Sequence, residues 1–247
     1  MTQTLTIVGL GLIGGSAGIA LRRRGWRVRY IDPHVSVDEA RQYEAADERA
    51  EKIDGDFILI ATSVDVAIDI LRDRPSGLTT SVCSVMQPLR DVAQTRFVAG
   101  HPMAGSHERG LGAAHGDLFE GKRWFLDAHD ETVEALVRDC GAIAEVVEGA
   151  EHDRAVALTS HLPQILSTAL AAYLGDHEDV LRFAGSGLAT FLRLAASDAS
   201  VWAPLIEANR ANIAPHVDEI ARVVREIVGG DASEAFERAQ RLWRKLQ

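Results

Sequence analysis

The pattern of hydrophobic and polar positions changes part-way along the chain. In the first half, short apolar and β-branched runs at 5–8, 28–31 and 57–60 alternate with helical segments. This alternation predicts a parallel sheet whose strands are connected by helices. After about Gly149 no convincing strand remains, and apolar residues recur three and four positions apart, as in helices. The pattern therefore predicts an α/β parallel-sheet domain over residues 1–149 and an all-helical domain over residues 150–247.

The same patterns predict the later elements of the first domain. Helices are expected over 64–72 and 131–140, and further strands near 81–84, 97–99, 124–126 and 145–147. The strand at 145–147 is expected to close the sheet.

Prolines, glycines and a capping residue divide the second domain. A long helix is predicted from Asp153 to Leu174, with a kink at Pro163 and an end near Gly175. Asp198 is a favourable N-cap for a second long helix that runs to Val228, and residues 233–246 form a last amphipathic helix.

A glycine-rich turn follows the first predicted strand. Gly9, Gly11 and Gly14 fit G-x-G-x-x-G at the head of an apolar helix. Gly9 allows the tight turn, Gly11 lets the main chain approach a pyrophosphate, and Gly14 lets the helix pack on the strand. The main-chain N–H groups that begin the helix, at Leu12, Ile13 and Gly14, would face the phosphates. The turn predicts a Rossmann-type dinucleotide site, and a glycine-rich turn without a ligand is the alternative.

Asp32 ends the second predicted strand. Its carboxylate is placed to accept hydrogen bonds from both ribose hydroxyls of a dinucleotide, which favours NAD over NADP. Arg29 and His34 lie nearby and leave NADP open as the less favoured cofactor.

A polar segment, G-H-P-M-A-G-S at 100–106, follows the apolar strand around Val98. Residues just beyond the ends of parallel strands line the ligand crevice. His101 would therefore lie beside the nicotinamide. An imidazole there can accept a proton while hydride leaves a substrate. The alternative is a histidine that only packs or caps a loop.

Four segments together resemble the prephenate and arogenate dehydrogenases of tyrosine biosynthesis. They are the V-G-L-G-L-I-G-G-S turn at 8–16, the segment at 100–106, T-S-H-L-P at 159–163 after His152-Asp153, and R-L-A-A-S-D at 193–198 followed by Trp202 and Asn209. They span nearly the whole chain in the family's order. The resemblance implies a nucleotide domain followed by a helical domain that forms the interface of a homodimer.

The resemblance also implies roles for individual residues. His101 would hydrogen-bond the ring hydroxyl as its carbon gives up hydride, and Ser84 would assist at the same hydroxyl. Arg193 would clamp a substrate carboxylate, for which a guanidinium offers two parallel donors. The alternatives are a surface arginine and a serine that merely ends a strand.

Four polar residues in or directly before the first long helix need separate interpretation. His161 and Gln164 lie three positions apart, so they share a helix face that could look into the substrate cleft. A buried polar pair satisfied by neighbouring helices is the alternative. His152-Asp153 is interpreted as the start of the helix rather than as catalytic.

Departures from the family pattern leave the substrate open. Met86 replaces a family lysine, Gln164 replaces a histidine found in many members, and residues 187–193 differ from the family's G-F-x-D-x-T-R. Prephenate or arogenate is preferred. Met86, which removes a positive charge, would favour 4-amino-4-deoxyprephenate as a close rival.

Two other functional classes remain as alternatives. One is a non-catalytic NAD-binding regulator on the same fold. The other is a β-hydroxyacid or imine reductase, which would require a catalytic lysine or aspartate on the first long helix; residues 153–174 contain no lysine and Asp153 stands at their start.

Composition limits the class of protein, its binding partners and its cellular compartment. The 247 residues are 47% hydrophobic and 25% charged, as in ordinary globular proteins, and the net charge of −10 argues against nucleic-acid binding. Two cysteines predict free thiols in a reducing cytoplasm. The histidines lack metal-ligand spacing, so no metal site is predicted.

The same sequence argues against a secretory signal and a membrane span. The basic cluster at 22–24 follows the N-terminal apolar run rather than preceding it. Ser160, His161 and Gln164 interrupt the best candidate for a span. The alanine-rich helices present more apolar surface than a small domain can bury, which again indicates a homodimer.

Overall fold

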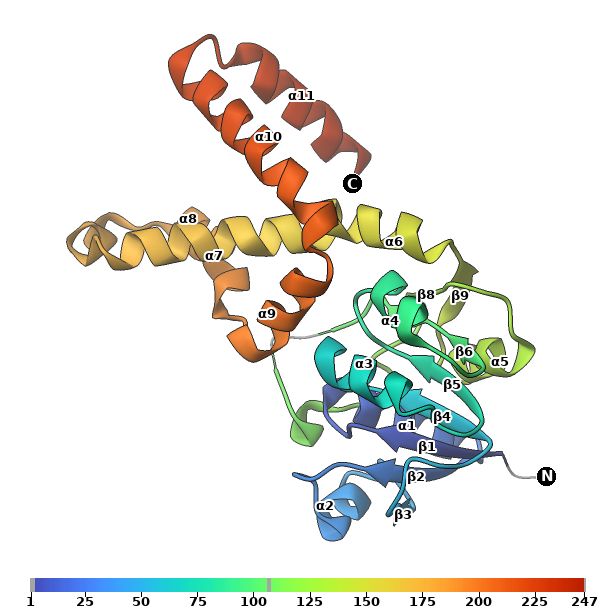
Figure 1. Cartoon of the computed structure of the whole chain (residues 1–247). Coiled ribbons are helices and arrows are strands. Elements are labelled where there is room, and N and C mark those ends of the chain that lie inside the picture. Colours follow the sequence, from blue (N-terminus) through green and yellow to red (C-terminus); the bar gives the residue numbers. More distant parts are fainter. Residues whose placement is uncertain (1–2, 106–107, 247) are drawn as a thin grey trace.

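The structure, a computed structural model, describes residues 3–105 and 108–246. Its first half contains a six-stranded sheet in which every neighbouring pair is parallel, in the order β3-β2-β1-β4-β5-β6 (Figure 1). The strands are β1 (Thr4–Val8), β2 (Arg27–Ile31), β3 (Glu48–Arg49), β4 (Phe57–Ile60), β5 (Leu78–Ser81) and β6 (Phe97–Val98). The order reverses between β1 and β4, which is the Rossmann arrangement and confirms the predicted fold class.

Helices cover both faces of this sheet. They are α1 (Leu12–Arg23), α2 (Val37–Gln42), α3 (Val64–Arg72), α4 (Gln87–Val92) and α5 (Glu131–Asp139), with a short 3₁₀ turn η1 (Leu111–Ala113). Neighbouring strand residues alternate between two core clusters: Leu59 belongs to one, and Ile58 and Ile60 belong to the other. Burial on both faces explains why these strands read as continuous apolar runs.

A second, three-stranded sheet carries His101. It consists of β7 (Gly100–Pro102), β8 (Arg123–Leu126) and β9 (Ile143–Val146); β7 and β8 are antiparallel, whereas β8 and β9 are parallel. The expectation that residues 145–147 close the main sheet is therefore wrong. A Cβ on Gly100 would lie 2.7 Å from the Ser81 carbonyl oxygen, so only glycine lets the chain turn away so close to β5. His101 consequently lies in a strand of its own rather than in a loop.

The helical half begins with one continuous helix where a proline kink was predicted. It comprises α6 (Gly149–Val156), a π-helical turn (Ala157–His161) and α7 (Leu162–Gly175). Pro163 stands in the first turn of α7. Because proline has no N–H to donate to the preceding turn, a wider turn there accommodates it without a break. The predicted end at Gly175 is confirmed.

By length and composition alone, the helix Gly149–Gly175 could cross a membrane, and its mean hydropathy is 1.2. Its polar residues His152, Asp153, His161 and Gln164 are nevertheless buried against the rest of the chain. These four polar side chains therefore face the interior of the folded chain.

The second long helix, predicted over residues 198–228, is in fact two helices. After η3 (Glu178–Phe183), α8 (Ser186–Leu192) and η4 (Arg193–Ala196), the chain forms α9 (Ala199–Ala208) and α10 (Arg210–Gly229). Asp198 caps α9 as predicted, by accepting a hydrogen bond from the Ser200 N–H. The helix breaks at Asn209, whose backbone is not helical and whose side chain bonds to the first long helix. The sequence contains no glycine or proline that marks this break.

The last helix, α11 (Ser233–Lys245), folds back along α10, and this pair extends away from the sheet domain (Figure 1). Large apolar side chains are exposed along the helical half. The most exposed include Phe183, Val228, Phe236, Leu242 and Trp243.

Candidate active site

The glycine-rich turn lies at the carboxyl end of β1, where the strand order reverses. Gly9 has a φ of +93°, and a Cβ there would lie 2.5 Å from the Ala61 carbonyl oxygen. A Cβ on Gly14 would lie 2.0 Å from the Gly9 carbonyl oxygen, whereas a Cβ on Gly11 would meet nothing within 4 Å. Gly9 and Gly14 are therefore needed for packing, and Gly11 leaves open space next to the turn.

Helix α1 starts at this turn without a side-chain cap. Gly11 is its N-cap, so the first main-chain N–H groups, at Leu12 and Ile13, receive no side-chain acceptor. Uncapped N–H groups at a helix start favour an anionic ligand. The turn thus fits the pyrophosphate of a dinucleotide.

Asp32 follows β2 and shapes the same turn. Its carboxylate accepts hydrogen bonds from the Leu10 N–H and the His34 N–H, each at 2.8 Å. A carboxylate has about four acceptor positions, so Asp32 can also bind ribose hydroxyls. Arg29, which could have favoured NADP, forms ion pairs with Glu48 and Asp54 instead.

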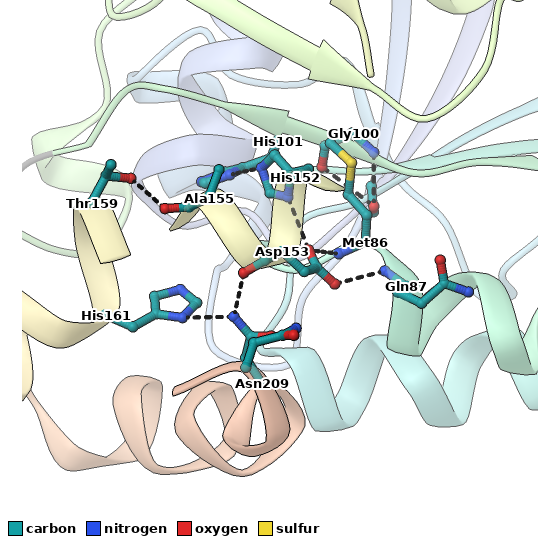
Figure 2. A network of polar contacts seen from close by, with 12 residues as sticks. Met86, Gln87, Gly100, His101, His152, Asp153, Ala155, Thr159, His161 and Asn209 are labelled. Carbon is teal, nitrogen blue, oxygen red and sulfur yellow. Dashed lines mark hydrogen bonds and ion pairs between the residues drawn. The ribbon is translucent and has the colours of Figure 1, made fainter. Parts of the chain in front are cut away.

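A buried chain of three side chains ends at His101 (Figure 2). His101 Nδ1 lies 2.9 Å from His152 Nε2, and His152 Nδ1 lies 2.9 Å from Asp153 Oδ1. The two imidazole rings meet edge to face, with their centroids 5.1 Å apart. His152 was not predicted as a site residue; its place in H-D before T-S-H-L-P was the only sequence signal.

Asp153 also joins the two halves of the molecule. Its carboxylate accepts hydrogen bonds from the Met86 N–H and the Gln87 N–H, both at 2.9 Å, at the start of α4. The interpretation of His152-Asp153 as a helix start is therefore wrong, because α6 begins at Gly149 and Asp153 caps a helix of the other domain. The cause is tertiary packing, which local sequence does not reveal.

The direction of hydrogen bonding along this chain follows from the carboxylate. An ionised carboxylate only accepts, so His152 carries its proton on Nδ1 and its Nε2 accepts from His101 Nδ1–H. His101 Nε2 is then left with a lone pair. Burial, with help from His152 and His161, lowers the pKa of His101 to about 3, so the ring is neutral near pH 7. The arrangement presents a neutral, oriented base.

His161 lies on the other side of Asp153. Its Nδ1 is 3.0 Å from Asn209 Nδ2, and Asn209 Nδ2 also donates to the Asp153 carbonyl oxygen at 2.9 Å. Burial lowers the pKa of His161 to about 4; His152 contributes in the same direction and Asp153 opposes it. The Trp202 ring lies edge-on, with its centroid 6.0 Å away.

Ser84 and Arg193 do not belong to this hydrogen-bonded chain. Ser84 is half-buried in the segment between β5 and α4, two residues before Met86. Arg193 opens η4 and is exposed. Ser106, the last residue of the G-H-P-M-A-G-S segment, lies outside the described residues.

Gln164 is hydrogen-bonded within the chain. It is 4% exposed, and its Nε2 donates to the Leu194 carbonyl oxygen at 2.7 Å and to Thr168 Oγ1 at 3.1 Å. Its Oε1 accepts from Ser197 Oγ at 3.3 Å. Both amide donors are thereby used, which matches the alternative of a buried polar residue satisfied by neighbouring helices.

Met86 is fully buried and packs in the apolar cluster beneath α3 and α4. This burial gives no support to the hypothesis that the residue at position 86 changes the charge near the substrate ring.

Among residues 3–105 and 108–246, no group of three or more His, Cys, Asp or Glu residues could hold a metal ion. Cys83 and Cys140 are free and buried.

A Rossmann sheet, a turn shaped for pyrophosphate and an oriented buried histidine define a dinucleotide-dependent dehydrogenase with a helical second domain. Residues 17–150 match the family description "Prephenate dehydrogenase, nucleotide-binding domain", and residues 148–242 match "Prephenate dehydrogenase, dimerization domain". The chain belongs to the prephenate dehydrogenase family. The family and the class of enzyme predicted from the sequence are confirmed.

Individual relatives agree with this assignment. A prephenate dehydrogenase of Bacillus subtilis is 31% identical over 92% of this chain and 70% of the relative. The probable prephenate dehydrogenase NovF of Streptomyces niveus is 32% identical over 94% of this chain and 72% of its own length. The crystal structure of Aquifex aeolicus prephenate dehydrogenase with hydroxyphenyl propionate and NAD+ is 26% identical, has a TM-score of 0.84, and covers 100% of this chain and 96% of that one.

Proposed function

We propose that this protein catalyses the NAD-dependent oxidative decarboxylation of a cyclohexadienyl substrate, with prephenate as the first candidate. The observation that carries the proposal is the buried His101–His152–Asp153 chain, which leaves a basic nitrogen on His101. Family membership and the names of the relatives support the choice of prephenate.

The cofactor site would be formed by the residues predicted from the glycine-rich turn. The pyrophosphate would bind the turn and the start of α1, and the ribose hydroxyls would bind Asp32, which disfavours the extra phosphate of NADP. The residues are Gly9, Gly11, Leu12, Ile13, Gly14 and Asp32. When bound, NAD supplies the hydride-accepting chemistry.

His101 would accept and later return the proton of the substrate hydroxyl. Its Nε2 accepts the proton of the ring hydroxyl as hydride leaves the same carbon, which gives a ring ketone. The bond to the ring carboxylate then breaks, carbon dioxide leaves, and the bonding electrons make the ring aromatic. The proton returns from His101 to the ring oxygen. His152 accepts from His101 Nδ1–H throughout, which keeps the Nε2 lone pair free for the proton of the substrate.

Two further residues would act on the substrate. Arg193 is exposed, so its guanidinium is available for a substrate carboxylate. Ser84 follows β5 and would assist at the ring hydroxyl, as the family resemblance implies.

Arogenate is the second candidate substrate. It differs from prephenate in the side chain rather than in the reacting ring, and a cyclohexadienyl dehydrogenase of Zymomonas mobilis is 24% identical over 93% of this chain. The amino analogue of prephenate stays the rival candidate. The charge argument for it depended on Met86 next to the ring, and Met86 lies in the core. Its remaining support is the similarity of this chain to NovF.

The protein would act as a homodimer in the cytoplasm. The helical half carries the family's dimerization domain, and its exposed apolar side chains would be covered by a second copy.

An assay with NAD tests the proposal. The purified protein is given prephenate, arogenate or 4-amino-4-deoxyprephenate, and reduced cofactor and aromatic product are measured. Prephenate or arogenate should have the highest kcat/KM, and NAD should be used in preference to NADP. Preference for the amino analogue, or for NADP, would contradict the corresponding part of the proposal.

A further inference from the structure

His161 contains a buried nitrogen without a hydrogen-bond partner. The residue is 0% exposed, and its Nε2 finds no partner among the residues that the structure describes. Buried polar atoms in folded proteins are almost always hydrogen-bonded, and an exception requires an explanation. A bound ligand whose atom forms a hydrogen bond with this nitrogen would explain the exception.

The contacts of Asn209 determine which nitrogen of His161 carries the proton. Asn209 Nδ2 lies 2.9 Å from the Asp153 carbonyl oxygen, which can only accept, so this atom of the amide is the donor. Asn212 Nδ2 donates to Asn209 Oδ1 at 2.7 Å, which agrees with this orientation. The second Asn209 N–H therefore points to His161 Nδ1, 3.0 Å away.

It follows that His161 Nδ1 is unprotonated and that the neutral ring carries its proton on Nε2. The titratable groups that act on the ring are His152 and Asp153 on α6, while Trp202 of α9 faces it edge-on. Burial and His152 outweigh Asp153, so the pKa of His161 is about 4 and the ring stays neutral near pH 7. The unpartnered group is thus an N–H donor.

Asp153 orients both histidines through different atoms (Figure 2). Its carboxylate holds His152, which holds His101, while its carbonyl oxygen holds Asn209, which holds His161. The two histidines are left with opposite hydrogen-bonding groups. His101 is left with an accepting nitrogen, whereas His161 is left with a donating one.

We propose that Asn209 is a positioning residue that fixes the tautomer of His161, so that His161 Nε2–H donates to an oxygen of the bound cyclohexadienyl substrate. The proposal rests on the proposed function for the identity of that substrate. The tautomer itself does not depend on it.

Nitrogen-15 NMR of the histidine side chains tests the tautomer directly. The His161 signals are assigned by their loss in His161→Gln. In the wild-type protein, Nε2 should be protonated and Nδ1 unprotonated at neutral pH, and in Asn209→Leu this single tautomer should be lost. A wild-type His161 with its proton on Nδ1 would overturn the proposal.

The probe for the substrate oxygen is prephenate itself, added without NAD so that it binds but does not react. The proton on His161 Nε2 should shift downfield when the probe binds, because a new acceptor is supplied. Binding of the probe without any change at this proton would also overturn the proposal.

Kinetics separates positioning from a general structural effect. Loss of the hydrogen bond to the substrate oxygen should raise KM roughly 10-fold, so His161→Leu should show this rise with a smaller change in kcat. His161→Gln should recover much of the affinity, because its amide can donate from a similar place. Asn209→Leu should raise KM in the wild-type background but have little effect on KM in His161→Gln, since glutamine has no tautomer to fix.

Equal effects of Asn209→Leu in both backgrounds would show a merely structural role and contradict the proposal. His129→Leu, at an exposed histidine of the other domain, is the matched control and should behave as wild type. If the wild-type protein does not turn over prephenate or arogenate, the proposed function fails, and the NMR measurement still decides the tautomer.

Discussion

At the scale of single residues, the site depends on neutral histidines that are kept away from water. His101 and His161 are buried, and the pKa of each is lowered, to about 3 and about 4. Because these pKa values lie well below 7, both rings are neutral over the physiological pH range and each can keep one defined tautomer. The low pKa values also have a consequence for stability.

Acidification should destabilise the protein through these two histidines. In the unfolded chain each titrates near 6.5, so between about pH 6.5 and pH 3–4 the unfolded state binds protons that the folded state cannot. Above pH 6.5 the two histidines therefore do not reduce the free energy of unfolding, and below it their neutral burial increasingly does. At pH 5 each histidine should lower the free energy of unfolding by on the order of 1–2 kcal/mol.

Urea unfolding at pH 7.5 and pH 5 checks this prediction. His161→Gln should show a smaller loss between the two pH values than the wild-type protein. An equal loss in both would assign the acid sensitivity to other groups.

The glycines of the turn provide a second prediction at this scale. Gly11→Ala should leave folding intact, because the added Cβ meets no atom within 4 Å, but it should weaken NAD binding by filling the approach to the turn. Gly14→Ala should instead destabilise the protein, because its Cβ would clash with the Gly9 carbonyl oxygen. Thermal unfolding and NAD titration of both variants distinguish the two effects. Similar behaviour of the two variants would contradict the prediction.

At the scale of elements, α7 holds the short helical turn that begins with Arg193. Gln164 donates to the Leu194 carbonyl oxygen, and Ser167, one turn further along, donates to the Phe191 carbonyl oxygen at 2.9 Å. These two bonds lie on either side of Arg193 in the sequence. They fix the backbone from which the exposed guanidinium extends.

Loss of this support should affect substrate binding through Arg193. Gln164→Leu leaves the Leu194 carbonyl oxygen without its donor, and we expect a KM increase of roughly 5- to 20-fold with kcat less affected. In an Arg193→Ala background the same change should add little, since the two residues act through one interaction. Steady-state kinetics of the four proteins measures this coupling. Ser167→Ala, which removes the other of the two bonds, is measured for comparison with Gln164→Leu. Independent effects of Gln164→Leu and Arg193→Ala on KM would refute the coupling.

The elements also show what could be predicted from sequence and what could not. Strands β1, β2, β4 and β6 of the main sheet carry a local signal, namely apolar runs, and their positions were predicted correctly. The strand expected at 81–84 is in fact β5 at Leu78–Ser81, and the two-residue strand β3 was missed. The π-helical turn before Pro163 and the break at Asn209 depend on packing between helices distant in sequence. The pairing of His101 with His152 has the same origin, and for this reason His152 was missed.

At the scale of the whole molecule, the helical half exposes too much apolar surface for a single chain. Phe236 is 59% exposed and Trp243 is 63% exposed, both on α11, which extends with α10 away from the sheet domain (Figure 1). Surfaces of this kind normally mark interfaces. The family's dimerization domain covers this region up to residue 242.

We therefore predict a homodimer held together largely by the helical half. Sedimentation at micromolar concentration should give twice the monomer mass, and Phe236→Glu together with Val228→Glu should shift the protein towards monomer or reduce its stability. Val66→Glu, at an exposed apolar residue of the sheet domain, is the control and should leave the dimer intact. A wild-type monomer would refute the prediction.

The most direct test of the account is a comparison of wild-type protein and His101→Asn with prephenate and NAD. The wild-type protein should form reduced cofactor, carbon dioxide and aromatic product in equal amounts. In His101→Asn, kcat should fall by about 10²–10⁴, as expected for loss of a general base, while NAD binding changes little. A folded His101→Asn protein with near-normal kcat would contradict the central role of His101.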